Sequence, residues 1–183
     1  LILFCVNAKL DAQVITNEGR EFWFAFPHVM DSTNARFWVN ITSKYSATGT
    51  VSIPGTGFSQ NFSVSPNQIA RINFNSADAH ISGSRVLRNK AIRISATANV
   101  VAYGVSYRQV RHEATLILPN RALGTSYRAM TYKSENKSNR LWRSEFVVVA
   151  AGDTAKVEIA YTDSVRNGGG PYKLDTVSIP PNQ

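Results

Sequence analysis

The stretch ARFWVNITSKYSATGTVSIPGTGFSQNFSVSPNQIARINF, residues 35–74, alternates apolar and polar side chains in short runs that turn-forming residues separate. The apolar positions of the successive runs are Phe37, Val39 and Ile41, then Val51 and Ile53, then Phe62 and Val64, then Ile69 and Ile72. Turn chemistry occurs at 46–49, 54–57 and 66–68. A period of two with a turn about every ten residues predicts a β-meander within a sandwich or barrel.

The composition of the whole chain is typical of the same fold class. Its 183 residues are 43% hydrophobic, which is enough for a buried core. Val, Ile, Thr, Ser, Phe and Tyr recur in short blocks broken by Gly, Asn and Pro, whereas helix-favouring runs are scarce. Further strands are expected at 91–95, 100–107 and 114–118. We therefore predict an all-β, β-sandwich-like protein with little helix.

A later segment, residues 146–183, repeats the pattern of residues 37–68, and both segments end on Pro-Asn-Gln. The apolar pairs that take the corresponding places are Phe146 and Val148, Val157 and Ile159, and Val177 and Ile179. The second copy is longer at a Gly-rich turn, where a repeat tolerates insertion. We predict two related antiparallel modules, the first at 14–111, and the second at 112–183 as a linking strand followed by a truncated module. A chance match between alternating strands is the alternative.

The first 13 residues, LILFCVNAKLDAQ, resemble the end of a secretory signal peptide, with cleavage near Ala12. Cys5 would be removed with this remnant, and as the single cysteine it excludes an internal disulfide. The alternative is a first β-strand. Because no run approaches the roughly 20 apolar residues of a spanning helix, we expect no transmembrane segment and a secreted or surface-held product.

The segment GREFWFAFPHVM, residues 19–30, concentrates aromatic rings. A period of two places Phe22, Phe24 and Phe26 on one face of a strand, and Trp23 and Ala25 on the other. Both faces are therefore apolar, and the strand must be covered on both sides or lie where two modules meet. An exposed aromatic platform for sugar stacking is the alternative, although no polar residues interleave the rings.

Ionisable residues show no catalytic or metal-binding pattern. His28, His80 and His112 are too far apart in sequence to form a metal motif, and no G-x-S-x-G elbow occurs. His112 and Glu113 are adjacent, and neighbours on a strand point to opposite faces. Paired carboxylates for glycoside hydrolysis are possible in principle among the 12 acidic residues. We expect no enzyme activity, no cofactor and no metal.

The formal charge of +8, from 20 basic and 12 acidic residues, suits contact with an anionic glycan, an anionic surface or nucleic acid. Tyr107, Arg108 and Arg111 form a loose version of a nucleic-acid-binding pattern, but a secreted protein seldom meets that target. The predicted contact surface is the loop 133–143, through its cations and its indole: Lys133, Lys137, Arg140, Trp142 and Arg143. A solvated variable loop is the alternative.

Six segments in this order and spacing carry a resemblance to a known family. They are GREFWFAFP, FWVNITS, GTVSIPGTGFSQNFSVSPNQ, AIRISATANVVAYG, ATLILPNRALGTSYR and SEFVVVAAGDTAKVEI. Over residues 19–183 the chain resembles the N-terminal domain of IgGFc-binding protein and related domains in large surface proteins of Bacteroidetes-type bacteria. The run from Leu118 and Pro119 through Leu123, Gly124 and Tyr127 carries it most strongly.

The resemblance implies an extracellular, non-catalytic β domain for recognition or adhesion within a longer protein. Its expected partner is an extracellular glycoprotein, a mucin-like glycan or a protein ligand, and further domains are expected in the same protein. Antibody binding is not carried over, because no ligand site of the family can be placed on these residues. A structural spacer, or an accessory domain attached to a secreted enzyme, is the alternative function.

Overall fold

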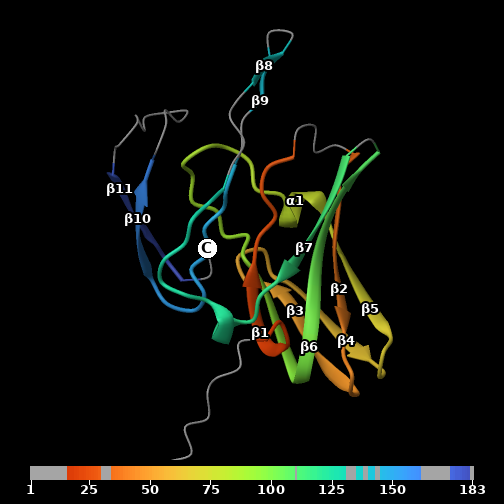
Figure 1. The fold of residues 1–183 in the computed structure, drawn as a ribbon. Coiled ribbons are helices and arrows are strands. Elements are labelled where there is room, and N and C mark those ends of the chain that lie inside the picture. The colour runs from red at the N-terminus through yellow and green to blue at the C-terminus, as the bar shows by residue number, and fades with distance from the viewer. Residues whose placement is uncertain are drawn as a thin grey trace, which may run out of the picture.

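The computed structural model describes residues 16–29, 34–109, 111–130, 135–137, 140–142, 145–161 and 174–181. The strands are β1 Gly19–Phe24, β2 Arg36–Thr42, β3 Ala47–Ile53, β4 Phe58–Val64, β5 Ile69–Phe74, β6 Ile92–Arg108, β7 Arg111–Ile117, β8 Glu135–Lys137, β9 Arg140–Trp142, β10 Ala155–Ala160 and β11 Leu174–Ile179. The helical elements are α1 Ser76–Ala79 and the 3-10 turn η2 Asn120–Ala122. The predicted all-β fold with little helix is confirmed (Figure 1).

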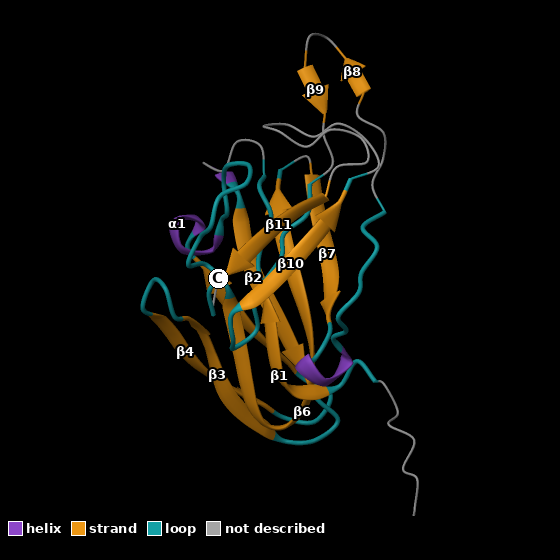
Figure 2. Cartoon of the chain, turned by 90° about the vertical axis from the view of Figure 1, so that its left-hand side faces the viewer, coloured by secondary structure: helices purple, strands orange, loops and turns teal. Residues whose placement is uncertain are grey.

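The long strand β6 organises the fold, because it belongs to two halves of one antiparallel sheet. Its N-terminal part lies between β1 and β3, where Ile94 pairs with Phe22 and Val51. Its C-terminal part lies between β2 and β7, where Ala102 pairs with Ile41 and Ile117. We call β4, β3, N-terminal β6 and β1 the first half-sheet, and β5, β2, C-terminal β6 and β7 the second half-sheet (Figures 1 and 2).

A β-bulge lies where β6 passes from one half-sheet to the other. Gly19 pairs with Val100, but Glu21 pairs with Ser95, so the register shifts between them. A bulge bends a strand and increases its twist, and such bends are how one strand serves two packed sheets. The result is the sandwich-like arrangement that the strand spacing predicts.

The predicted meander is wrong at two of its three connections, because β2 and β3 are not hydrogen-bonded neighbours, and neither are β4 and β5. β6 lies between β2 and β3, and only β3 and β4 form the expected hairpin, closed by the turn at 54–57. The turn predicted at 46–49 lies earlier, since β3 already begins at Ala47. Alternation and turn residues define strands locally, but they do not determine which distant strand fills the space beside each one.

The turn at 66–68 forms as predicted, with Asn67 at φ 60 and its amide donating to the Ser43 carbonyl at 2.8 Å. After it, Ile72 is buried whereas Ile69 is 67% exposed. Residues three apart on a strand point to opposite faces. The two isoleucines therefore do not share one face.

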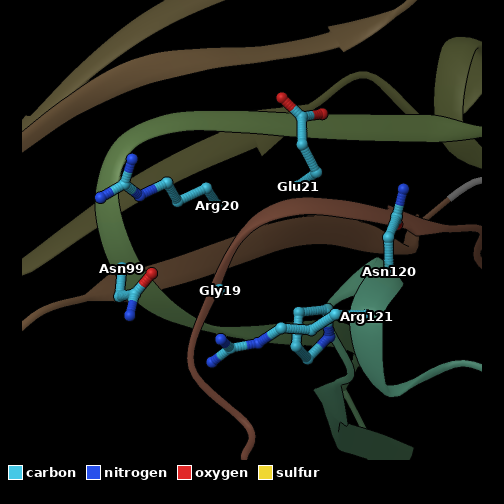
Figure 3. Close-up of a pocket in the computed structure, with 7 residues that line it drawn as sticks. Gly19, Arg20, Glu21, Asn99, Asn120 and Arg121 are labelled. Atoms are coloured by element: carbon cyan, nitrogen blue, oxygen red, sulfur yellow. The ribbon is translucent and has the colours of Figure 1, made fainter. Parts of the chain in front are cut away.

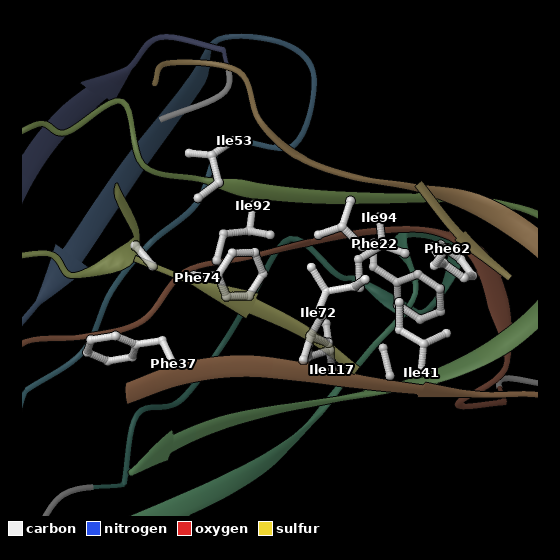
Figure 4. Packing of buried hydrophobic residues seen from close by; sticks show 14 of the residues in the cluster. Phe22, Phe37, Ile41, Ile53, Phe62, Ile72, Phe74, Ile92, Ile94 and Ile117 are labelled. Atoms are coloured by element: carbon white, nitrogen blue, oxygen red, sulfur yellow. The ribbon is translucent and has the colours of Figure 1, made fainter. Parts of the chain in front are cut away.

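The core fills the space between the two half-sheets with side chains from the first seven strands (Figure 4). Phe22 is fully buried, and Phe26 lies 5.5 Å from Phe24 and 5.0 Å from Phe37 between ring centroids. The prediction that Phe22, Phe24 and Phe26 share one face is confirmed, and that face is the core. Trp23 points the other way, toward Arg93.

The hairpin of β10 and β11 lies at the side of the molecule opposite β5 (Figure 1). Val157 pairs with Val177 in an alternating register, and Ile179 at the strand end is buried. Arg85 and Asp175 join the hairpin to the loop before β6 through a 2.6 Å ion pair. The segment around Phe146 and Val148, predicted to match β2, has no regular structure.

Some predictions on domain organisation remain open. The predicted signal remnant at 1–13 lies outside the described residues. The predicted linking strand is β7, which pairs with β6 along its length. The division into two related modules stays a prediction. Among the described residues, none of the helical elements has the length and apolar character needed to cross a membrane.

Candidate binding surface

The two half-sheets present outer faces of contrasting chemistry, although each carries a tryptophan beneath an arginine. On the first half-sheet, the Arg93 guanidinium lies 5.9 Å from the Trp23 ring centroid. On the second, the Arg71 guanidinium lies 5.0 Å from the Trp38 ring centroid. Such cation–π pairs are held by attraction between the cation and the ring quadrupole. The residues next to each pair determine whether the charge of its arginine is neutralised.

The first outer face is rich in hydroxyl groups, and we call it the hydroxyl face. Its members are the outward residues Glu21, Trp23, Thr48, Thr50, Ser52, Ser59, Asn61, Ser63, Arg93, Ser95 and Thr97. Glu21 accepts hydrogen bonds from Arg93 at 3.1 Å and from Ser95. Thr50 donates to Asn61 at 2.9 Å. Several polar groups of this face therefore bond to one another, and its arginine has an acidic partner.

The second outer face, which we call the Trp38 face, consists of every second residue from Arg36 to Thr42, from Ile69 to Asn73, from Val101 to Tyr107 and from His112 to Leu116. The register brings them into rows across four strands. One row contains Arg71, Asn40, Tyr103 and Leu116. The core burial of the intervening residues forces these side chains outward.

The Trp38 face combines exposed rings with cations and contains no Asp or Glu at any outward position. Tyr103 is 40% exposed and Tyr107 is 37% exposed. Tyr107 lies between the Trp38 ring, at 6.2 Å, and the His112 ring, at 6.0 Å. Trp38, Tyr107 and His112 therefore form one connected row of rings, and Tyr103 lies on the same face.

The arginines of the Trp38 face have no acidic partner among the described residues. Arg71 donates from Nε to the neutral Asn40 Oδ1 at 3.1 Å, and neither Arg71 nor Arg36 forms an ion pair in this part of the chain. Trp38 adds a buried indole N–H for which the described residues offer no acceptor. Tryptophan, tyrosine and arginine are the residues that most often dominate recognition surfaces.

The predicted contact loop contains the hairpin of β8 and β9, which projects from the rest of the structure (Figures 1 and 2). Lys137 pairs with Arg140, and Trp142 pairs with Glu135. Lys133 and Arg143 are not among the residues that the structure describes, and for Lys137, Arg140 and Trp142 it describes the backbone alone. The segment contains two short strands rather than the irregular loop expected, and its role as a contact surface stays a prediction.

The nucleic-acid pattern at 107–111 is divided by the sheet. Tyr107 points outward on the Trp38 face, whereas Arg108 pairs with Arg111 at the opposite set of positions. His112 is outward and Glu113 is not, as the alternation predicts. The Trp38 face could not be predicted from any single segment, because its rings come from different strands. The signal in the sequence is that Trp38 lies between the core residues Phe37 and Val39, and that Tyr103 follows the core residue Ala102.

The structure brings together two histidines that are 52 positions apart in sequence. The rings of His28 and His80 lie 5.4 Å apart, and His28 Nδ1 lies 3.6 Å from Glu145 Oε1. His80 Nε2 accepts a hydrogen bond from the Val29 amide at 3.1 Å. Burial, and then the charges of His28 and Lys90, lower the pKa of His80. Across the described residues no group of three or more metal-ligating side chains forms.

A shallow pocket lies where the start of β1 meets the segment after β7 (Figure 3). It is lined by Gly19, Arg20, Glu21, Asn99, Pro119, Asn120 and Arg121. Arg121 reaches across it to the Thr16 hydroxyl and the Glu18 carbonyl. These hydrogen bonds hold the chain just before β1 against the segment after β7. The pocket therefore results from the packing of these two segments.

Comparison with known proteins supports the resemblance in the C-terminal part of the chain. A family model described as IgGFc binding protein matches residues 113–180. No curated protein and no solved structure matches the chain significantly. The matched range contains β7 from Glu113 onward but no part of β2, β5 or β6. Most of the Trp38 face therefore lies outside the part of the chain that the family model describes.

Proposed function

We propose that this chain is a non-catalytic extracellular recognition or adhesion module of the IgGFc-binding type, within a larger secreted or surface protein. The family match supports a binding role, since the matched model is named for a binding protein. The sequence resemblance favours a surface protein of a Bacteroidetes-type bacterium. The ligand class is an extracellular glycoprotein or glycan.

The observation that carries the proposal is the acid-free aromatic surface on the second half-sheet. Tyr103, Tyr107 and Leu116 are exposed together on this face beside the partly buried Trp38, and an apolar patch of this kind often marks an interaction site. On the hydroxyl face, by contrast, the stacked arginine is paired with Glu21 and several hydroxyl groups are hydrogen-bonded within the face. The difference between the two faces supports recognition by the Trp38 face.

The hairpin of β8 and β9 is a second proposed contact. Its segment contributes Lys133, Lys137, Arg140, Trp142 and Arg143, which would attract an anionic ligand at long range. A contact of this kind mainly accelerates association and weakens as salt rises. The hairpin would therefore assist the Trp38 face rather than replace it.

The test is binding of the whole chain to mucin-type glycoproteins, to a set of free glycans and to IgG Fc, at low and high salt. We expect binding to at least one of these, lost in Trp38→Ala and retained in the matched control Trp23→Ala. Neutralising Lys137, Arg140 and Arg143 should weaken binding mainly at low salt. A folded chain that binds none of them would favour the alternative, a structural spacer or an accessory domain of a secreted enzyme.

A further inference from the structure

We propose that the Trp38 face binds a saccharide that carries carboxylate groups, with Arg71 as the residue that recognises the carboxylate. This inference rests on the proposed function and adds the site and the chemistry of its ligand.

Two neighbours hold the Arg71 guanidinium in place. The ring of Trp38 lies beneath it and Asn40 accepts from Nε, so the guanidinium plane is fixed while its charge is not neutralised. A fixed guanidinium offers two parallel N–H donors to a carboxylate, which a flexible ammonium cannot do. Arg93 on the hydroxyl face has the same stacking but is already paired with Glu21. Of these two stacked arginines, only Arg71 is available to an external carboxylate.

Two tyrosines of β6 extend the face away from Arg71. Tyr103 pairs with Asn40 beside Arg71, and Tyr107 lies four residues further along the strand, at about 13 Å. Tyrosine and tryptophan rings present an apolar face together with a polar tip. This suits a sugar, whose rings have apolar C–H faces and hydroxyl edges. The spacing of the tyrosines favours an extended chain of several sugar residues over a single one.

The dimensions of the face argue against a folded protein as the occupant. Four strands about 4.8 Å apart, with up to seven residues of about 3.3 Å each, give roughly 19 by 23 Å, or about 440 Å². A standard protein interface buries about 800 Å² of accessible surface on each partner, so a folded partner would have to contact more of the molecule than this face. A second copy of the chain fits no better, because a two-fold contact would oppose the arginines of both copies with no acidic residue on either face.

The test is a titration of the whole chain with three carboxylated probes: an oligogalacturonate, a hyaluronan oligosaccharide and oligosialic acid. Each is compared with its own carboxyl methyl ester, which keeps the sugar and removes the charge. We expect at least one probe to bind, and its ester to bind about tenfold more weakly or worse. Arg71→Gln should bind the acid about tenfold more weakly than the parent chain does, and it should bind the ester with unchanged affinity. Arg71→Lys should recover only part of the lost affinity for the acid, and Arg93→Gln is the matched control that should bind as the parent does.

Several outcomes would overturn the inference while leaving the proposed function intact. These are equal binding of acid and ester, no effect of Arg71→Gln, or binding of a sulfated, uronate-free polymer or of a protein at the Trp38 face in place of the carboxylated probes. Failure of all three carboxylated probes would also overturn it. The proposed function itself fails only if the glycoproteins, neutral glycans and IgG Fc are not bound either.

Discussion

The Arg71 guanidinium lies 5.0 Å from the Trp38 ring centroid and donates to Asn40, whereas Arg93, 5.9 Å from Trp23, donates to Glu21. The same stacked pair thus occurs on both outer faces with a neutral neighbour in one case and an acidic one in the other. Because the acid neutralises its arginine, only the pair on the second half-sheet contributes net charge to its surface.

This difference predicts that the Arg71–Trp38 contact and the Arg93–Glu21 ion pair depend differently on salt. In a double-mutant cycle on the free energy of unfolding, Arg71→Ala and Trp38→Ala should couple by about 0.5–1 kcal/mol. That coupling should change little as salt rises. The cycle between Arg93→Ala and Glu21→Ala should lose most of its coupling between low and high salt, because both groups are partly exposed. Urea denaturation at two salt concentrations measures both, and equal salt dependence would contradict the assignment.

The fully buried ring of Phe22 predicts a large cost for its removal. Phe22→Ala should lower the free energy of unfolding by about 3–5 kcal/mol, because it leaves a cavity between the two half-sheets. Tyr45→Ala is the matched aromatic control, since Tyr45 is 65% exposed and should change stability by less than about 0.5 kcal/mol. Similar midpoints of chemical denaturation for the two variants would show that the aromatic segment is not the centre of the core.

Much of this core could be predicted from the sequence, because alternation is a local property. The period of two correctly assigned Phe22, Phe24 and Phe26 to the core, and Phe37, Val39 and Ile41 likewise. The insertion of β6 between β2 and β3 could not be predicted in this way. It depends on pairings such as Val39 with Gly104, 65 positions away, which no turn residue encodes.

The Trp38 face illustrates the same limit for the candidate site. Alternation places Trp38 opposite the buried Phe37, but it does not say whether that opposite face is covered by another layer. Arg71 and Tyr103 join Trp38 only through the order of β5, β2 and β6. The loop at 133–143 could be predicted as a contact surface because its charges are close in sequence, whereas the Trp38 face is assembled from four strands.

Gly49 lies in close contact with β6 beside its bulge, and a side chain at this position should therefore destabilise the fold. A Cβ at this position would lie 2.1 Å from the Ser95 carbonyl oxygen and 2.7 Å from the Phe62 ring. Since one of these atoms is backbone, β6 itself must shift, and Gly49→Ala should cost about 1–3 kcal/mol of stability. Gly124→Ala is the control, because its Cβ would meet nothing within 4 Å. Thermal denaturation compares them, and an unaffected Gly49→Ala variant would contradict the close approach.

The buried imidazole of His80 predicts a loss of stability in mild acid. Its Nε2 must be unprotonated to accept from the Val29 amide, and burial together with the charges of His28 and Lys90 lowers its pKa below the ordinary 6.5. Above that value the group is neutral whether folded or unfolded, so its contribution is fully present. As the pH falls toward the folded pKa, the unfolded chain binds a proton first, and stability declines by at most about 1.4 kcal/mol per pH unit. Below the folded pKa this decline stops.

His80→Gln isolates this contribution, because the glutamine carbonyl can accept from Val29 without titrating. Unfolding measured between pH 8 and pH 5 should show a shallower decline for His80→Gln than for the parent chain. His112→Gln, at an exposed position on the Trp38 face, should leave the parent's decline unchanged. If the parent and His80→Gln declined in parallel, another group would be responsible for the loss. If His80→Gln alone flattened the curve, the hydrogen bond from Val29 would be the contact that joins the segment after β1 to the end of α1 only while His80 is neutral.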